Sequence, residues 1–419
     1  MISPLFAAAA ILGLNVHQSS TVGPNATKGA ALGIVRIDAN WVDCEKSQGQ
    51  YDFTLFDQVV NAAQANNLAV LAVLGYGPAF DSSGDKLGDG STNDIPKPGT
   101  YAAFVTAAVN HLKDRVTAYE LWNEPNLQQF FEGTPQDYIS NVLIPGADAL
   151  HAACPTCLVV APALATVGTD YATWLDAVLA AAKDKIDIVS GHDYAHFPQD
   201  SPGSGGANDS FYNKLESHRI VKIGTTIAYE GPLSFKEVMD AHGAKQPFWI
   251  TETGIEATYG DTTQEATQTL YYRRVLESML TRPWWQATVF YEAFDVPPPA
   301  QYHFGVCVDD SAASLGYDEK PVMAMLRKAA QNQPVFGGTG TDCNDGLDND
   351  GDGNIDSADP DCAKGTNEGL PPVDAGTPDA GDVEMETAGG GGCNCNASGS
   401  EPSALLLIAM LALRRRRAR

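Results

Sequence analysis

The run Gly33-Ile-Val-Arg-Ile-Asp38, the stretch Thr54–Asn66 and the run Ala69-Val-Leu-Ala-Val-Leu74 decide the predicted fold. The two short runs are rich in aliphatic and β-branched residues, and the longer stretch between them has apolar residues at helical spacing. This alternation is typical of parallel strands that are joined by a crossover helix. The sequence therefore predicts a β-α-β unit in this region.

The same alternation extends in both directions, from Leu12 to about Gln333. We expect eight strands, at Leu12–His17, Gly33–Asp38, Ala69–Leu74, Thr117–Trp122, Leu158–Ala161, Ile186–Ser190, Phe248–Thr251 and Thr288–Tyr291. We expect helices at Thr54–Asn66, Tyr101–Lys113, Pro135–Ala153, Tyr171–Lys183, Gln264–Thr281 and Lys320–Gln331. Eight such units predict an α/β fold of the (β/α)8 TIM-barrel type. A doubly wound open sheet is the main alternative, but the chain lacks the glycine-rich phosphate-binding motifs of that fold.

Composition limits the partners that the chain could have. The 419 residues include 26 Lys and Arg against 52 Asp and Glu, a formal net charge of −26. Nucleic acids and anionic surfaces are bound by basic footprints, so the charge argues against such partners. With 44% hydrophobic residues the chain can build a substantial core, so disorder throughout is excluded. We expect a monomer with one large domain and smaller appendages.

Two glutamates follow predicted strands at positions where a barrel places its reacting groups. The fourth strand leads into Asn123-Glu124-Pro125, and the seventh leads into Thr251-Glu252. Catalytic groups of such barrels lie at the carboxyl ends of the strands. Two carboxyl groups that face one site suit the cleavage of a glycosidic bond, which needs a proton donor and a nucleophile or base. An isolated glutamate at a strand end would more often lie at the surface or cap a loop.

These motifs resemble the clan A glycoside hydrolases, and within the clan families 39 and 5, over residues 12–333. The resemblance implies a retaining enzyme that cleaves β-glycosidic bonds of a polysaccharide or oligosaccharide without a catalytic cofactor. It implies that Glu124 is the acid/base, with a raised pKa, and that Glu252 is the nucleophile. It also implies that Asn123 holds the sugar 2-hydroxyl group.

Further positions agree with the resemblance. Arg36 matches the clan's arginine near the nucleophile, although it could instead pair with Asp38 or Glu120 inside the barrel. His192-Asp193-Tyr194 resembles a His-x-Tyr motif whose tyrosine contacts the nucleophile and whose histidine lies near the acid/base. Two positions depart from the clan. Gly75-Tyr76-Gly77-Pro78 replaces a frequent histidine, and Tyr291 stands where a tryptophan commonly binds sugar. These departures favour a relative of family 39 over a cellulase, and we expect Tyr291 to bind substrate.

A few large aromatic residues offer platforms for sugar rings, and we expect one or two of them to serve in this way. They are Trp41, Tyr76, Phe80, Trp284 and Trp285.

The C-terminal region has a different character. Between Thr341 and Thr387, fourteen acidic residues face the single basic residue Lys364. Within this region an EF-hand-like spacing predicts a Ca²⁺ site with the ligands Asp348, Asp350, Asp352, Asn354, Asp356 and Asp359. The flanking Cys343 and Cys362 suggest a disulfide, as in thrombospondin type 3 repeats, which this loop resembles. An unliganded acidic linker is the alternative. Cys154 and Cys157 are expected to form a local disulfide or to be two structural thiols.

The two ends of the chain carry the expectations about location. Residues 1–11 read as the remnant of a signal peptide, or as a stub before the first strand. Residues 393–419 combine cysteines, a short apolar run and an arginine cluster. They resemble myxobacterial sorting tails, which implies secretion, a sorting protease and retention at the cell surface or envelope; a degraded transmembrane anchor is the alternative.

The expected organisation is a barrel at 12–333, a linker at 334–342, the calcium loop at 343–362, a flexible linker at 363–392 and the tail at 393–419. The region after the barrel is thus predicted to be a disordered stalk. A functional alternative remains open, in which the chain is a catalytically inactive carbohydrate-binding or adhesive surface protein on the same barrel.

Overall fold

The structure is a computed structural model, and most of the predicted barrel region is described in it. The described residues are 11–17, 22–88, 90, 92–166, 170–194, 215, 219–223, 226–230, 233–280, 282–296, 302–309, 313 and 315–330. The signal-peptide remnant up to residue 10, the linkers, the calcium loop and the sorting tail lie outside these residues.

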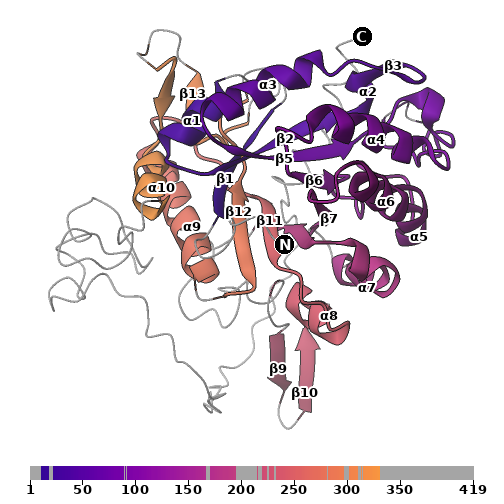
Figure 1. Ribbon diagram of the computed structural model, residues 1–419. Helices are drawn as coiled ribbons and strands as arrows, with labels where there is room; N and C mark the ends of the chain where they lie inside the picture. The colour runs from indigo at the N-terminus through magenta and orange to yellow at the C-terminus, as the bar shows by residue number, and fades with distance from the viewer. Residues whose placement is uncertain are drawn as a thin grey trace, which may run out of the picture. The chain divides into compact units, whose positions relative to one another are not determined.

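Eight parallel strands close into a barrel in the order β1, β12, β11, β8, β7, β6, β5, β2 (Figure 1). Their bounds are β1 Ile11–Val16, β2 Ile34–Asn40, β5 Ala69–Gly75, β6 Ala118–Leu121, β7 Leu158–Ala165, β8 Ile188–His192, β11 Phe248–Thr253 and β12 Trp285–Phe290. Each overlaps one predicted strand, so all eight are confirmed. Strand β1 pairs with both β2 and β12. This closure makes the open-sheet alternative wrong and confirms the (β/α)8 fold.

Helices surround the barrel (Figure 1). They are α1 Gly23–Gly29, α2 Trp41–Cys44, α3 Thr54–Ala65, α4 Thr100–Leu112, α5 Pro135–Tyr138, α6 Ile144–Ala153, α7 Tyr171–Ala182, α8 Phe235–Ala241, α9 Thr262–Leu280 and α10 Val322–Ala330. The predicted helices are confirmed to within two residues at each end, except that the one at Pro135–Ala153 is divided.

The divided helix consists of α5, a π-helical segment Ile139–Leu143 and α6. Thr134 caps its start, since its hydroxyl accepts a hydrogen bond from the Asp137 N–H and the Asp137 side chain bonds back. Pro145 occupies the second position of α6. Proline has no N–H with which to continue the preceding hydrogen-bond ladder, which accounts for the change of winding just before it.

Several short elements went unpredicted. Besides α1, α2 and α8, they are three hairpins, β3 Glu45–Ser47 with β4 Gln50–Tyr51, β9 Arg219–Ile223 with β10 Thr226–Glu230, and β13 Cys307–Asp309 with β14 Tyr317–Glu319. Each of these single helices and strands spans seven residues or fewer. Segments of that length hold too few turns or alternations to establish a period in sequence.

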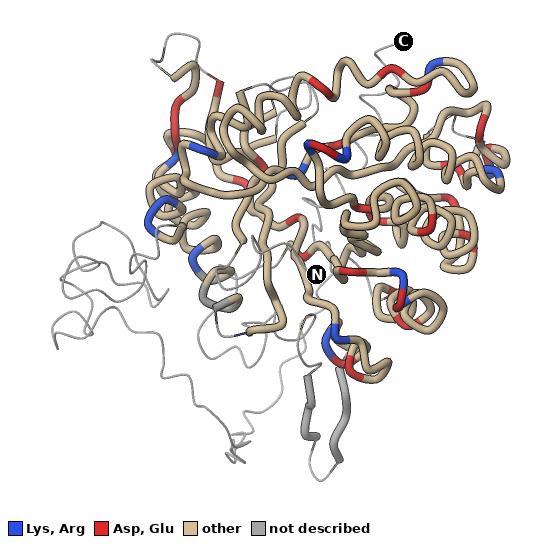
Figure 2. Tube along the Cα trace, viewed as in Figure 1, with Lys and Arg blue, Asp and Glu red and all other residues tan. Residues whose placement is uncertain are grey.

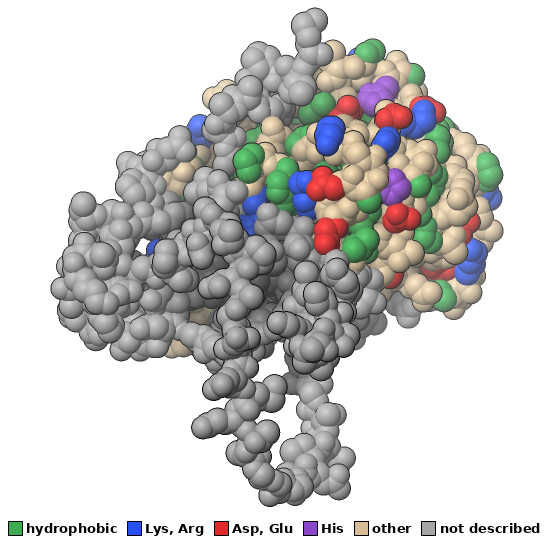
Figure 3. Space-filling view, turned by 90° about the horizontal axis from the view of Figure 1, so that it is seen from below, with side chains coloured by type: hydrophobic (Ala, Val, Ile, Leu, Met, Phe, Trp, Pro, Cys, Tyr) green, Lys and Arg blue, Asp and Glu red, His purple; other side chains and the backbone are tan. Residues whose placement is uncertain are grey.

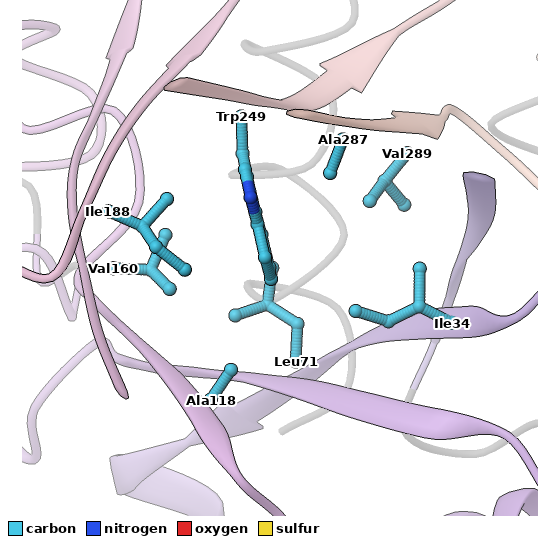
Figure 4. Packing of buried hydrophobic residues seen from close by; sticks show 8 residues of the cluster. All are labelled: Ile34, Leu71, Ala118, Val160, Ile188, Trp249, Ala287 and Val289. Carbon is cyan, nitrogen blue, oxygen red and sulfur yellow. The ribbon is translucent and has the colours of Figure 1, made fainter. Parts of the chain in front are cut away.

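Apolar side chains fill the barrel interior toward the amino-terminal ends of the strands, and we call them the lower layer (Figure 4). It consists of Ile34, Leu71, Ala118, Val160, Ile188, Trp249, Ala287 and Val289, each at most 3% exposed. Seven of the eight strands supply these side chains, and the Trp249 ring lies between them (Figure 4). The layer fills the barrel as a solid core, as is usual for this fold.

Charged residues lie mainly on the outer helices and loops, with a few acidic residues on the central strands (Figure 2). On the described part of the face in Figure 3, basic and acidic side chains are interspersed. Among the described residues, no helix is both long and apolar enough to span a bilayer.

Cys154 and Cys157 form a disulfide, so the local-disulfide prediction is confirmed.

Candidate active site

A polar layer lies directly above the apolar one on the same strands. Two residues beyond Ile34 is Arg36, and two residues beyond Ala118 is Glu120. Successive side chains of a strand alternate between its faces, so residues two apart point to the same side, here the barrel interior. Arg36 and Glu120 are at most 2% exposed. The strands thus change from apolar to ionised side chains toward their carboxyl ends, the end where such barrels build active sites.

The structure brings the two predicted glutamates together with His192. Glu124 follows β6 by three residues, Glu252 lies in β11, and His192 ends β8. One carboxylate oxygen of each glutamate and one ring nitrogen of His192 all lie within 4.8 Å of one another. Retaining glycosidases hold their carboxyl groups about 5–5.5 Å apart, whereas inverting enzymes need about 6.5–9.5 Å. An approach of two carboxylate oxygens to within 4.8 Å is compatible with the retaining spacing and is closer than the inverting one.

The backbone around Glu124 adopts an uncommon conformation. Trp122 and Glu124 have φ angles of 78° and 45°, in the left-handed region that non-glycine residues rarely occupy. Strand β6 ends at Leu121, one residue before the predicted end at Trp122. The left-handed residues end the strand. Strained backbone of this kind is concentrated at functional sites.

Both oxygens of Glu252 accept strong hydrogen bonds. Arg36 Nη1 donates to Oε1 at 2.5 Å, and the Tyr194 hydroxyl donates to Oε2 at 2.8 Å. Burial raises the pKa of Glu252, while the charge of Arg36 and the Tyr194 hydrogen bond oppose the rise. The charge of Arg36 therefore acts to keep this carboxyl group ionised, but burial is the larger influence on its pKa.

Arg36 binds four side chains, which three strands or their ends supply. Its Nε donates to Glu120 at 2.7 Å, Nη1 also donates to Asn15 Oδ1 at 2.9 Å, and Nη2 donates to Asn123 Oδ1 at 2.7 Å. Both alternatives considered for Arg36 therefore occur together. It forms an ion pair with Glu120 inside the barrel and another with Glu252. A guanidinium presents its donors in a rigid planar fork, so it fixes the positions of all these side chains.

Glu124 faces the imidazole of His192. Nδ1 of His192 lies 2.9 Å from Glu124 Oε1 and 3.6 Å from Glu252 Oε2. Burial raises the pKa of Glu124, and the charge of Glu252 adds to the rise, while His192 and Arg36 oppose it. The expected direction of this shift is confirmed.

The other predicted binding residues lie around this pair. Asn123 donates from Nδ2 to the Tyr76 hydroxyl at 3.0 Å. Tyr291 is 6% exposed, and its ring meets the rings of Tyr194 and Phe304 edge-on. Burial and then the charge of Glu252 raise the pKa of Tyr194 well above its usual value, so its hydroxyl keeps the proton that it donates.

The expected sugar platforms fare differently. Trp41 is fully buried and stacks on Phe104 at 5.3 Å, and Trp285 is 2% exposed, so both are packing residues. These two candidates are excluded as platforms because their large apolar rings fill the interior, which agrees with the expectation that only one or two of the five bind sugar. Tyr76 is also mostly buried and acts through its hydroxyl. Phe80 is exposed.

A second polar cluster lies at the ends of β1, β2 and β12 and was missed in the sequence. His17 Nε2 lies 2.6 Å from Glu292 Oε2, and its Nδ1 lies 3.3 Å from Asp38 Oδ2. Asp38 was considered only as a partner of Arg36. Two sequence signals could have predicted the cluster. Asp38 lies two residues beyond Arg36 on the same strand, and His17 and Glu292 lie just past the ends of their strands.

Two clusters of side chains that could ligate a metal ion lie among the described residues. Carboxylate and imidazole groups gather at Glu124, His192 and Glu252, and at Asp85, Asp94 and Glu132. The first group is engaged in the hydrogen bonds above. In the second, Glu132 accepts hydrogen bonds from the N–H groups of Lys86 and Leu87, and Asp85 from that of Gly88. These contacts order the loop before α4.

No family model matches the chain. Among curated proteins, a β-xylosidase of Geobacillus stearothermophilus is 25% identical over 154 residues, or 34% of this chain. The match spans 31% of that protein, less than a third of its length.

Solved structures share the barrel fold. A family 39 glycoside hydrolase from Bacteroides cellulosilyticus WH2 aligns with a TM-score of 0.55 and 19% identity, over 77% of this chain and 63% of that one. A monomeric β-xylosidase from Caulobacter crescentus CB15 aligns with a TM-score of 0.54 and 20% identity, over 78% and 70%. A family 30 endoxylanase from Clostridium papyrosolvens C71 aligns with a TM-score of 0.53 and 17% identity, over 77% and 72%. The described barrel therefore has the fold of these clan A glycoside hydrolases.

Proposed function

We propose that the chain is a retaining glycoside hydrolase that cleaves β-glycosidic bonds of a polysaccharide or oligosaccharide. The observation that carries the proposal is the approach of Glu124 and Glu252, whose oxygens lie within 4.8 Å across the ends of β6 and β11. The shared fold of the family 39 and family 30 glycoside hydrolases supports it. No catalytic cofactor is part of the proposal.

The surroundings of the two carboxyl groups suggest their roles. Glu252 receives donors from Arg36 and Tyr194, which hold its oxygens and stabilise their charge, so it suits attack on the anomeric carbon. The side chain of Glu124 instead meets the ring of His192, and burial favours the protonated form of Glu124. It suits protonation of the leaving oxygen.

The proposed reaction is a double displacement. Glu252 forms a bond to the anomeric carbon while Glu124 transfers its proton to the departing oxygen. Glu124, now a carboxylate, then takes a proton from water, and the water oxygen displaces Glu252 from the sugar. Both carboxyl groups return to their starting states.

The proposed substrate contacts are Arg36, Asn123, His192, Tyr194 and Tyr291. Of these, Asn123 is proposed to hold the sugar 2-hydroxyl group, as the resemblance to clan A implies. Because two of the similar structures are a β-xylosidase and an endoxylanase, we propose β-xylosides as the first substrates to test.

The test is hydrolysis of a panel of aryl β-glycosides, xylosides first, by the full chain, with the anomer that forms first identified by proton NMR. The proposal predicts turnover with retention, which Glu252→Gln abolishes and the nearby control Glu256→Gln does not. Inversion, or activity that survives in Glu252→Gln, would contradict it. Sugar binding without any turnover would favour the inactive carbohydrate-binding alternative.

We also propose that the stalk holds a structural Ca²⁺ ion through Asp348, Asp350, Asp352, Asn354, Asp356 and Asp359, with Cys343 and Cys362 disulfide-bonded. The EF-hand-like spacing supports this. Calorimetric titration of the full chain with Ca²⁺ should show one site that Asp352→Ala weakens, and peptide mapping should find the disulfide.

For location, we propose secretion and retention at the cell surface through residues 393–419, after cleavage by a sorting protease. Cell fractionation of the full chain, against a chain truncated after residue 392, tests this. Release of only the truncated chain into the medium is the expected result.

A further inference from the structure

We propose that Glu120 and Thr251 are positioning residues that fix the tautomer of His192, so that its Nδ1 atom accepts a hydrogen bond from the protonated carboxyl group of Glu124. The inference rests on the proposed function, in which Glu124 is the acid. It extends that function, because it gives two buried residues that do not contact the substrate a role in orienting His192.

The chain of hydrogen bonds starts at Glu120, which is fully buried. Its Oε2 accepts from Arg36 Nε at 2.7 Å, and its Oε1 accepts from the Thr251 hydroxyl at 2.8 Å. A carboxyl group paired with a permanently charged guanidinium is ionised, and an ionised carboxylate is only an acceptor. The single hydroxyl proton of Thr251 is therefore committed to Glu120.

This commitment determines which nitrogen of His192 carries a proton. Thr251 Oγ1 lies 3.1 Å from His192 Nε2. Since the hydroxyl proton points to Glu120, Oγ1 can only accept from His192, and Nε2 must donate. A neutral imidazole carries one proton, so Nδ1 is then bare.

The bare Nδ1 lies 2.9 Å from Glu124 Oε1. A hydrogen bond between them requires a proton on Glu124 when the ring is neutral. The opposite tautomer would instead donate from Nδ1 and stabilise the Glu124 carboxylate. The relay from Glu120 therefore favours the acid form of Glu124, which the first step of the reaction needs.

Other charged and titratable groups face this pair. Glu252 Oε2 from β11 lies 3.6 Å from Nδ1, and Arg36 from β2 binds both Glu252 and Glu120. Tyr194, which follows β8, donates to Glu252. The negative charge of Glu252 also favours retention of one proton between Glu124 and His192.

The test compares Thr251→Val, which removes the hydroxyl, with Thr251→Ser, which retains it. The substrates are the phenyl and 2,4-dinitrophenyl glycosides of a sugar that the wild type hydrolyses. Phenol is a poor leaving group and needs protonation, whereas dinitrophenol leaves without it. General acid catalysis contributes about 10²–10⁴-fold, so we expect Thr251→Val to lower kcat/KM for the phenyl glycoside by about tenfold or more. The loss for the dinitrophenyl glycoside should be much smaller.

The pH profile is the second readout. In Thr251→Val the basic limb of kcat/KM for the phenyl glycoside should move to lower pH, because the carboxylate of Glu124 is now stabilised by an Nδ1 proton. Thr251→Ser should restore both the rate and the limb. Equal losses on the two substrates, or an unmoved basic limb, would overturn the inference.

A measurement without turnover separates the inference from the proposed function. Long-range proton–nitrogen NMR of the histidine rings, with His192 assigned by its loss in His192→Asn, reports the tautomer directly. We expect the wild-type neutral ring to be protonated at Nε2, and Thr251→Val to change that pattern. A wild-type ring protonated at Nδ1 overturns the inference even where the enzyme is active, whereas absence of glycosidase activity overturns the proposed function alone.

Discussion

The barrel interior contains an apolar lower layer and a polar upper layer, which lie two residues apart along the same strands and differ in their physical character. The lower layer carries Ile34 and Ala118, while the upper carries Arg36 and Glu120 on the same strands. A step of two residues advances about 6.6 Å along a strand. Within that distance the interior changes from close-packed hydrocarbon to a network of buried charges. A single set of strands thus supplies both the core that stabilises the barrel and the groups that we propose do chemistry.

The two layers depend on different physical quantities. Apolar side chains stabilise the fold in proportion to the area they bury, about 25 cal/mol per Å². The contribution of buried charges does not scale with buried area. It depends on their pairing, because removal of one partner leaves the other charges uncompensated. Changes in the lower layer should therefore alter stability alone, and changes in the upper layer should alter activity and its dependence on pH.

The largest expected difference between the layers comes from Glu252→Gln above and Ile34→Val below. Loss of the nucleophile should reduce kcat by about 10⁴-fold or more. Ile34→Val should cost about 0.5–1.5 kcal/mol of unfolding free energy and leave kcat unchanged. Steady-state kinetics and urea unfolding of both variants check this. A comparable loss of kcat in Ile34→Val would break the distinction.

Glu124→Gln should give the next largest effect. Without the proton donor, kcat/KM for the phenyl glycoside should fall by about 10²–10⁴-fold, and much less for the dinitrophenyl glycoside. The basic limb of the pH profile should disappear, since the titrating acid is gone. Rates measured across pH on both substrates check this. A basic limb that remains would assign the acid to another residue.

Arg36→Met and Leu71→Ala should lose similar stability for different reasons. The first leaves Glu120 and Glu252 buried without their cation, and should cost about 3–5 kcal/mol. The second opens a cavity in the lower layer and should cost about 2–5 kcal/mol. Urea unfolding measures both.

Only Arg36→Met should also move the acidic limb of the pH profile. Loss of the positive charge raises the pKa of Glu252 further, so that limb should shift to higher pH. A limb that stays in place, or one that moves equally in Leu71→Ala, would argue against the assignment of Glu252.

The smallest expected effect is on the pH dependence of stability. The pKa of Glu124 is raised in the folded protein, so its contribution is fully present below the unfolded pKa of about 4.3 and is lost as pH rises through the folded value. Glu124→Gln removes this dependence. Its Tm relative to that of the wild type should therefore increase from about pH 4 to neutral pH. Ile34→Val should keep a constant offset, and an offset in Glu124→Gln that is equally constant would contradict the raised pKa.

The sequence allowed the upper layer to be predicted where a residue lies at a strand end. Glu124 and Glu252 were predicted because parallel strands bring their carboxyl ends to one rim, whereas His192 and Tyr194 were predicted from the resemblance to a clan A motif. Arg36 was found by its match to clan A.

The partners inside the barrel could not be predicted in the same way. Which inward side chains meet depends on the stagger of neighbouring strands, which a linear pattern does not specify. Glu120 was therefore only one of two possible partners of Arg36, and the role of Thr251 in orienting His192 was missed. For a related reason the sequence could not separate Trp41 from the other candidate sugar platforms, because exposure of an aromatic residue is a property of the packed structure.

The most direct test of the account is to trap the enzyme with a 2-deoxy-2-fluoro glycoside and map the labelled peptide by mass spectrometry. The account predicts a stable glycosyl ester on Glu252, which forms in the wild type and not in Glu252→Gln. An ester on any other residue would contradict it.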